Sequence, residues 1–281
     1  MKRDPDFDYQ VGMRAHPSDM SWTKCLWSLL VPWHNEWLNI WLYLAFSIYF
    51  WVECILIMAR SKTYGFQFEK NWDFMFVATL SIAVSFSMTT GYLIFYSMSE
   101  HTKLLLDGFD YMGKLILVFG FTFAWTASEL INSPIYFYFM FFVVAVLAVN
   151  LVLVQYPKGR TISFWVTIGL ISCVYVYDFA IYSTPKQKRV FYIPIFVEGL
   201  ILGAGWLMYY FQIPERLCRG SRFVQLYLTG YHFYTLFLIN FVFEAHQILY
   251  YAIKLNAGNY DDYYDNWWRI DNIFHKTPEA E

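Results

Sequence analysis

The chain has 281 residues, of which 58% are hydrophobic, 23% are aromatic and only 15% are charged. An ordinary soluble domain carries about 25% charged residues, so this composition indicates a protein that crosses a membrane several times. The formal net charge of −2, without a basic block, argues against nucleic acid as a partner, and the four cysteines lack the spacing of a zinc finger.

The chain begins with a polar stretch that gives way to a short tryptophan-rich one. Residues 1–24 lack the apolar core of a cleavable signal peptide. Residues 25–35, CLWSLLVPWHN, mix Trp and Leu with a proline, as segments that lie in a membrane interface do; the alternative is the frayed start of the first span. We expect residues 1–36 to form a cytosolic arm with an interfacial segment.

The rest of the chain is dominated by apolar segments, each close to the roughly 20 residues that cross a bilayer as a helix. Seven such segments are predicted, at about 37–59, 74–98, 110–131, 134–156, 161–183, 191–213 and 226–254. The connections are short, so neighbouring helices should pack side by side. The sequence therefore predicts an all-α integral membrane protein with one seven-helix domain over residues 37–254.

Residues 255–281 form an acidic, tyrosine-rich stretch and are expected to be a carboxy-terminal tail. An odd number of spans places the two ends of the chain on opposite sides of the membrane. The distribution of Lys and Arg among the loops favours a cytoplasmic amino terminus, although only slightly. The expected location is the plasma membrane or an endomembrane.

The most informative polar feature follows the second apolar segment. A polar turn from Ser99 to Lys103 is expected there, and Asp110 and Lys114 then stand where the third segment becomes apolar. Residues four apart share one face of a helix, and a charged pair within a membrane is costly unless it is matched or reaches water. Lys114 is therefore either the counter-charge of Asp110 or a side chain that extends to the interface.

Further polar residues within the apolar segments are candidates for a site. Glu198 is an intramembrane carboxylate and a candidate to line a central cavity, with hydrogen bonding in the core as the alternative. His232 is either a hydrogen-bonded core residue or a ligand. His246 follows fourteen residues later, about 21 Å along a helix, so the two imidazoles cannot share one metal ion.

Three stretches of the sequence resemble the progestin and adipoQ receptor family of seven-helix proteins. The stretch that leads into the first span carries GMR at 12–14, CLWSL at 25–29 and HNEWLNIW at 34–41. SE at 99–100 is followed by FDYMG at 109–113, and IPERL stands at 213–217, before the last span. Each motif alone is weak, but the three occur in the family's order relative to seven apolar segments.

The resemblance implies a bundle of the adiponectin receptor type around a buried zinc ion. Its ligands come from a Ser-x3-His pattern on the second helix and a His-x3-His pattern on the seventh, and an aspartate on the third reaches the metal through water. At the family spacing these positions fall on Thr89 and Leu93, on Tyr231 and Thr235, and on Asp110. Leucine cannot bind zinc, and a shift of one residue to His232 would leave Leu236 as its partner.

The resemblance also implies a receptor for adiponectin or progestins, or a ceramidase-like hydrolase. Lys114 replaces an apolar residue of the family, so we interpret it as the cation that replaces zinc. We predict a divergent, metal-free, receptor-like or regulatory member, with neither cofactor nor catalytic residues, that binds a membrane lipid or steroid-like ligand. The candidate ligand-binding residues are Thr89, Asp110, Lys114, Glu198, Tyr231, His232 and Thr235.

The alternative is an enzyme, a zinc-dependent lipid amide hydrolase with a rebuilt metal site. In that interpretation Asp110, His232 and Glu198 would hold the ion. Zinc would suit such a reaction because it lowers the pKa of bound water and polarises an amide carbonyl. The metal content of the purified protein distinguishes the two interpretations.

Overall fold

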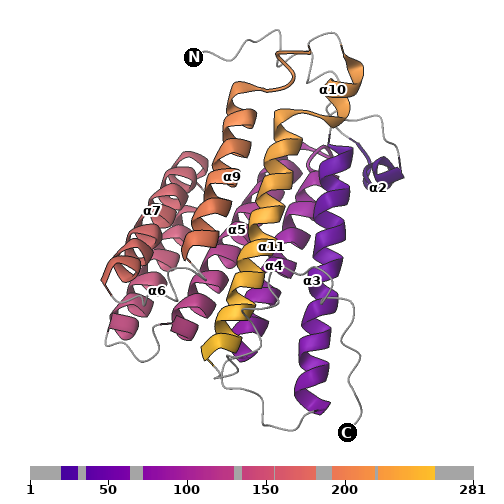
Figure 1. Cartoon of the computed structure of the whole chain (residues 1–281). Coiled ribbons are helices and arrows are strands. Elements are labelled where there is room, and N and C mark those ends of the chain that lie inside the picture. Colours follow the sequence, from indigo (N-terminus) through magenta and orange to yellow (C-terminus); the bar gives the residue numbers. More distant parts are fainter. Residues whose placement is uncertain are drawn as a thin grey trace, which may run out of the picture.

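The computed structural model describes residues 20–30, 36–63, 72–129, 135–154, 156–181, 192–218 and 221–256. These residues form helices and turns, so the predicted all-α class is confirmed. The long helices are α3 (Trp37–Thr63), α4 (Trp72–Phe95), α5 (Glu100–Glu129), α6 (Ile135–Leu153), α7 (Pro157–Ile181), α9 (Ile193–Phe211) and α11 (Gly230–Asn256). They run roughly parallel or antiparallel to one another in a bundle (Figure 1).

Four of these helices are long and apolar enough to cross a membrane. The apolar ranges are Trp37–Ala59 in α3, Asp73–Phe95 in α4, Gly159–Tyr177 in α7 and Ile193–Phe211 in α9. Helix α6 holds a shorter apolar range, Phe141–Leu153. Each long helix of the described residues coincides with one of the seven predicted segments. By length and composition alone, however, only the four helices named above qualify as membrane spans among the described residues.

Two helix starts differ from the prediction. The polar turn expected at Ser99 to Lys103 is mostly helical, and α5 begins at Glu100, ten residues before the predicted start of the third span. The Ser99 hydroxyl accepts a hydrogen bond of 3.1 Å from the Thr102 backbone N–H, which caps the helix. The last segment is also interrupted, because the short α10 (Arg222–Tyr227) ends before α11 begins at Gly230.

The predicted interfacial segment is partly described. Helix α2 (Trp22–Trp27) and the 3-10 turn η1 (Ser28–Leu30) lie beside the amino-terminal end of α3 (Figure 1), and residues 31–35 lie outside the described ranges. The indoles of Trp37 and Trp41 both donate to the Leu29 carbonyl, at 2.9 and 2.8 Å, and hold η1 against α3. The predicted tail beyond Asn256 and the residues before Met20 are also outside the described ranges.

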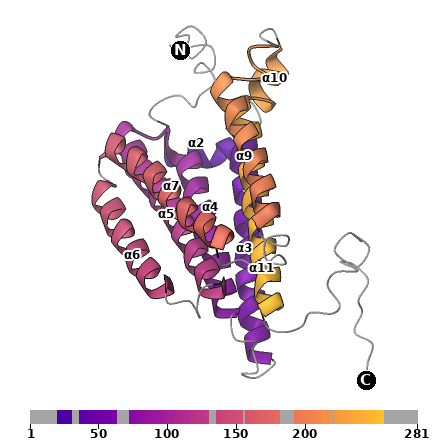
Figure 2. The same cartoon turned by 60° about the vertical axis from the view of Figure 1, so that its left-hand side comes forward.

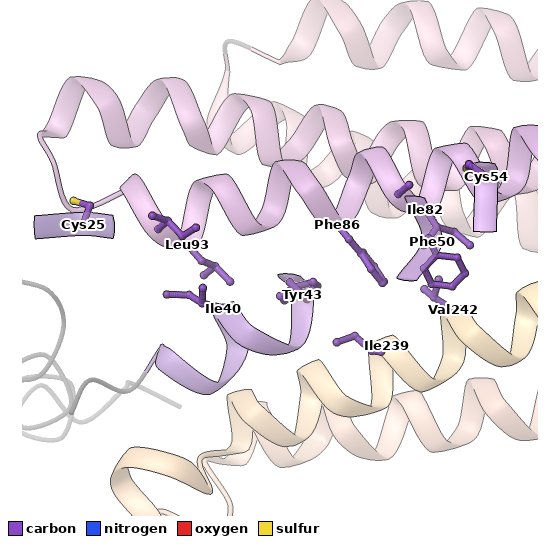
Figure 3. Packing of buried hydrophobic residues seen from close by; sticks show 12 residues of the cluster. Cys25, Ile40, Tyr43, Phe50, Cys54, Ile82, Phe86, Leu93, Ile239 and Val242 are labelled. Carbon is purple, nitrogen blue, oxygen red and sulfur yellow. The ribbon is translucent and has the colours of Figure 1, made fainter. Parts of the chain in front are cut away.

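The main apolar core lies between α3, α4 and α11. Phe50 of α3 and Phe86 of α4 are almost completely buried and face Ile239 and Val242 of α11 (Figure 3). Aromatic rings meet edge to face here; the centroids of Tyr43 and Phe86, for example, are 5.4 Å apart. These contacts fix the register of the three helices that carry most of the candidate site residues.

Two glycines allow close helix contacts. A Cβ atom on Gly120 of α5 would lie 2.4 Å from the Cβ of Ser81 on α4, and one on Gly205 of α9 would lie 2.3 Å from a ring carbon of Phe237 on α11. Both distances are shorter than real side-chain contacts, so any larger residue would push the helices apart. Glycine at these positions brings α5 against α4 and α9 against α11.

Helices α6 and α7 pack on the far side of α5, away from α3 (Figure 2). A buried polar network joins them to α5. The Tyr111 hydroxyl donates to Asn150 Oδ1 at 2.7 Å, and the Asn150 amide donates to Thr167 Oγ1 at 2.8 Å. Arg160 of α7 forms an ion pair with Asp107 of α5. The network fixes the rotation of α5, on which Asp110 and Lys114 stand.

Candidate functional site

Asp110 is held by two side chains, one on each oxygen of its carboxylate. Oδ1 accepts a hydrogen bond of 2.7 Å from the Thr89 hydroxyl on α4, and Oδ2 lies 2.5 Å from the ammonium of Lys114, one turn further along α5. The Asp110 side chain is 7% exposed and that of Lys114 is 48% exposed. The buried carboxylate is therefore paired with a cation that also reaches the surface of the bundle.

The positions that the resemblance assigns to zinc ligands carry side chains that do not suit the metal. Leu93 of α4 is 3% exposed and lies in the apolar core, near Ile40 in Figure 3. Thr235 of α11 is completely buried, its hydroxyl makes no hydrogen bond of ordinary length with a described residue, and the phenol of Tyr43 faces it.

Structural zinc sites use thiolate, imidazole and carboxylate ligands in a tetrahedral arrangement. Among the residues that the structure describes, no three His, Cys, Asp or Glu side chains lie close enough to hold one metal ion. The residues at Leu93, Tyr231 and Thr235 therefore do not fit the implied zinc.

Phenol groups gather around the Asp110 carboxylate instead. Four tyrosines lie within electrostatic range of it, and they come from α3, α4 and α11. A phenol can both donate and accept a hydrogen bond, so each ring adds a polar contact to an apolar surrounding. We refer to the following residues as the Asp110 cluster: Tyr43, Thr89, Tyr92, Asp110, Lys114, Tyr231 and Tyr234.

Glu36 adds a second carboxylate at the same end of the bundle. It precedes α3, and its Oε2 accepts a hydrogen bond of 3.0 Å from the Asn39 amide. Its charge acts on Tyr43, Tyr92 and Tyr231. Desolvation raises the pKa of the Glu36 carboxyl above its ordinary value, and the Asn39 hydrogen bond partly opposes this rise. Glu36 therefore favours its protonated form more than a solvent-exposed glutamate does.

His232 caps the helix on which it stands. Its Nδ1 accepts a hydrogen bond of 3.1 Å from the backbone N–H of Thr229 and lies 2.7 Å from the Thr229 hydroxyl. The Thr229 hydroxyl in turn accepts from the His232 backbone N–H at 3.3 Å. This reciprocal arrangement is a capping box in which an imidazole takes the usual place of a Glu or Gln. The Nδ1 lone pair is thus engaged by Thr229.

Glu215 of the IPERL motif also contacts the start of α11. It is 6% exposed, and its Oε1 accepts a hydrogen bond of 2.8 Å from the Gly230 backbone N–H. Burial raises the pKa of the Glu215 carboxyl above its ordinary value, and hydrogen bonds from backbone N–H groups partly offset that effect. The motif therefore determines where α11 begins, and so where Tyr231 and Thr235 lie.

Glu198 lies apart from the Asp110 cluster. Its Oε2 accepts a hydrogen bond of 2.8 Å from the Asn240 amide, which links α9 to α11. Glu244, one turn beyond Asn240, lies within electrostatic range of Glu198. The structure therefore brings Thr89, Asp110, Lys114 and Tyr231 to one end of the bundle, whereas Glu198 has its polar contact more than two turns along α11 from Tyr231.

Sequence reasoning missed several members of this region. Tyr43 and Tyr92 stand on apolar helices among many other aromatic residues, and no spacing distinguishes them. In the sequence, Glu36 and Glu215 are distinguished only as parts of the HNEWLNIW and IPERL motifs. A carboxylate at the boundary of an apolar helix is a usable signal for both, because such a group needs either water or a hydrogen-bond donor.

One comparison with known proteins assigns the chain to a family. The family model described as haemolysin-III related matches residues 31–275, a range that contains every long helix of the described residues and the whole Asp110 cluster. No curated protein matches the chain. Because the match covers far more than half of the sequence, the chain belongs to the haemolysin-III-related family of membrane proteins, the family domain of the progestin and adipoQ receptors.

Proposed function

We propose that this protein is a divergent, metal-free member of its family that acts as a receptor-like or regulatory membrane protein. All seven long helices of the described residues would cross the membrane, with the amino terminus in the cytoplasm. A membrane lipid or steroid-like molecule would bind between the helices, at the Asp110 cluster. Charged residues in α5 and mainly uncharged polar residues in α11 lower the apolarity of these two helices. Hydrogen-bond and ion-pair partners within the bundle would offset the cost of placing them in a membrane.

The state of the Asp110 carboxylate carries the proposal. The resemblance places a water-linked metal beside this group, yet both carboxylate oxygens are already bound by Thr89 and Lys114. A lysine cannot act as a Lewis acid, but it supplies the positive charge that a buried carboxylate requires. This supports a protein that keeps the electrostatic balance of the family site without its metal.

The Asp110 cluster also offers groups that a ligand can use. The ammonium of Lys114 is about half exposed and acts on the phenol of Tyr234. Tyr209 of α9 packs against both Tyr231 and Tyr234, with ring centroids 5.7 and 5.9 Å apart. A ligand with a carbonyl, carboxylate or hydroxyl oxygen could accept hydrogen bonds from this group while its apolar body lies along the helices.

The hydrolase interpretation has less support from the geometry. It needs Asp110, His232 and Glu198 on one ion, and each of these side chains is already engaged elsewhere. Asp110 is bound by Lys114 and Thr89. His232 contacts Thr229, and Glu198 contacts Asn240. A rebuilt metal site would require all three sets of contacts to change together.

Photo-crosslinking tests the proposed ligand site. The full-length protein in detergent would be irradiated with a photoreactive, clickable sterol and with a photoreactive ceramide, and the labelled peptides would be mapped. We expect saturable labelling of α4, α5 and α11 around Thr89, Lys114 and Tyr231, reduced by Tyr231→Phe with Lys114→Leu. The matched control is Tyr210→Phe, an exposed tyrosine of α9.

Labelling that follows lipid-facing residues such as Phe141 and Trp165 in proportion to their exposure would contradict the proposed site. Release of free fatty acid from the ceramide probe by the metal-loaded protein would favour the hydrolase interpretation instead.

A further inference from the structure

A second polar site lies at the opposite end of the same helices. A cavity of about 190 Å³ opens between α3, α4 and α11, and its lining includes Tyr49, Glu53, Ile57, Met75 and Tyr250. Met75 precedes Thr89 by fourteen residues on α4, which is about 21 Å along the helix. The cavity is thus well separated from the Asp110 cluster.

One stripe of α3 forms the wall of this cavity. Tyr49, Glu53 and Ile57 are spaced four residues apart and therefore lie on one face of the helix. Glu53 is the one acidic residue in the sequence of α3, and its side chain is 24% exposed. It stands six residues before Ala59, the end of the apolar range, or about 9 Å along the helix. The carboxylate thus lies about two helical turns inside the carboxy-terminal end of the apolar range.

A buried histidine lies behind Glu53. His246 of α11 is completely buried, and its Nε2 lies 2.9 Å from the Thr79 hydroxyl and 3.8 Å from Glu53 Oε1. The Thr79 hydroxyl donates its hydrogen to the Met75 carbonyl at 2.8 Å, so it accepts from an N–H on His246 Nε2. His246 Nδ1 has no hydrogen-bond partner among the described residues, so a proton there would be a buried, unpartnered donor.

The other residues in the lining are aromatic or apolar. Tyr49 lies within electrostatic range of the Glu53 charge, and Tyr250 lines the same cavity from α11. Met75 is 1% exposed and forms an apolar, polarisable part of the lining. A cavity lined by one carboxylate and two aromatic rings is suited to an organic cation, because ring faces attract positive charge in addition to the carboxylate. The volume is several times the roughly 30 Å³ that one water molecule occupies.

We propose that this cavity binds an organic ammonium group, with Glu53 as its counter-ion and the rings of Tyr49 and Tyr250 beside it. Two sources share this chemistry: the choline or ethanolamine headgroup of a membrane lipid, and a free amine from the aqueous side. The site involves no residue of the Asp110 cluster, so the proposal is tested independently of the proposed receptor-like function.

The lipid source is tested by native mass spectrometry of the full-length protein, released from an equimolar mixture of phosphatidylcholine and phosphatidylglycerol. We expect phosphatidylcholine adducts to exceed phosphatidylglycerol adducts by about 5- to 10-fold, as cation–π and charge contributions of this kind allow. Glu53→Gln should return the ratio to that of the mixture. Glu244→Gln is the matched control, because Glu244 is another partly buried carboxylate within a helix and does not line the cavity.

The free-amine source is tested in phosphatidylglycerol nanodiscs by thermal unfolding in tetramethylammonium chloride, with sodium chloride at equal ionic strength as reference. A rise in midpoint that Glu53→Gln abolishes, without lipid selectivity, identifies a site for soluble amines. If Glu53→Gln fails to fold, the same measurements are made on Tyr250→Leu, which removes the ring, and on Tyr250→Phe, which removes only the hydroxyl. Absence of both effects, or an equal loss in Glu244→Gln, would overturn the proposal.

Discussion

The ammonium of Lys114 lies 2.5 Å from Oδ2 of Asp110, one helical turn earlier on α5, while the opposite oxygen of the same carboxylate accepts a hydrogen bond from Thr89. This relationship connects two helices through one buried charge. It also places a fixed positive charge where the family resemblance implies a metal ion. Its consequences for stability and metal content can be measured.

The first prediction is that Asp110 and Lys114 are energetically coupled. Lys114→Leu should destabilise the detergent-solubilised protein by about 2 kcal/mol, because it leaves the Asp110 carboxylate without its cation; the value is below the 3–5 kcal/mol of fully buried pairs since Lys114 is half exposed. Adding Asp110→Asn should recover part of the loss. Lys103→Leu, an exposed lysine of the same helix, is the control. Strictly additive losses would show that Lys114 is only extending to water.

A second prediction concerns the other oxygen of Asp110. Thr89→Val should cost about 2 kcal/mol, because a hydrogen bond to a buried charged group is lost. Thr89→Ser should retain most of the stability. Thr90→Val is a matched control one residue away, since among the described residues the Thr90 hydroxyl bonds the Phe86 carbonyl, one turn earlier on the same helix. Equal losses for the two valine variants, measured by thermal unfolding in detergent, would mean that the Thr89–Asp110 bond contributes nothing specific.

The third prediction is a pH dependence at Glu215. Because burial raises the pKa of Glu215 in the folded protein above its ordinary 4.5, the folded state favours the protonated acid. Its contribution to stability is complete below pH 4.5 and is lost as the pH rises through the raised value. Glu215→Gln keeps an acceptor for Gly230 and should flatten this part of the stability profile. A variant with the same slope as the wild type between pH 4.5 and 8 would exclude Glu215 as its source.

A fourth prediction concerns topology. Seven spans require the two ends of the chain to lie on opposite sides of the membrane, and the slight excess of basic residues in alternate loops places the amino terminus in the cytoplasm. Split-fluorophore tags at each end, with complementary fragments in the cytosol, should report the amino-terminal tag only. If both tags report, the number of spans is even and at least one long helix does not cross.

The helices were predictable because each apolar segment is long and bounded by polar residues. The ends of the helices were less predictable. Ser99 and its neighbours read as a turn from composition, yet the Ser99 side chain caps a helix that continues through Lys103. The break before α11 was also missed, because its apolar residues continue across the Thr229 cap.

The candidate site was likewise predictable only in part. The four-residue spacing indicates that Asp110 and Lys114 share a helix face, and the resemblance points to Thr89. The partners of His232 and Glu198 depend on a local cap and on the packing of α9 against α11, which no spacing in the sequence reveals. Tyr43 and Tyr92 join the cluster through tertiary packing alone.

Elemental analysis of the purified protein tests the central claim, which is that Lys114 takes the place of a metal ion beside Asp110. The full-length chain would be purified in detergent without added zinc, treated briefly with a mild chelator, and its zinc measured per chain by mass spectrometry. We expect far less than one zinc per chain, because Leu93, Tyr231 and Thr235 stand where ligands would be needed. One tightly held zinc per chain would contradict it.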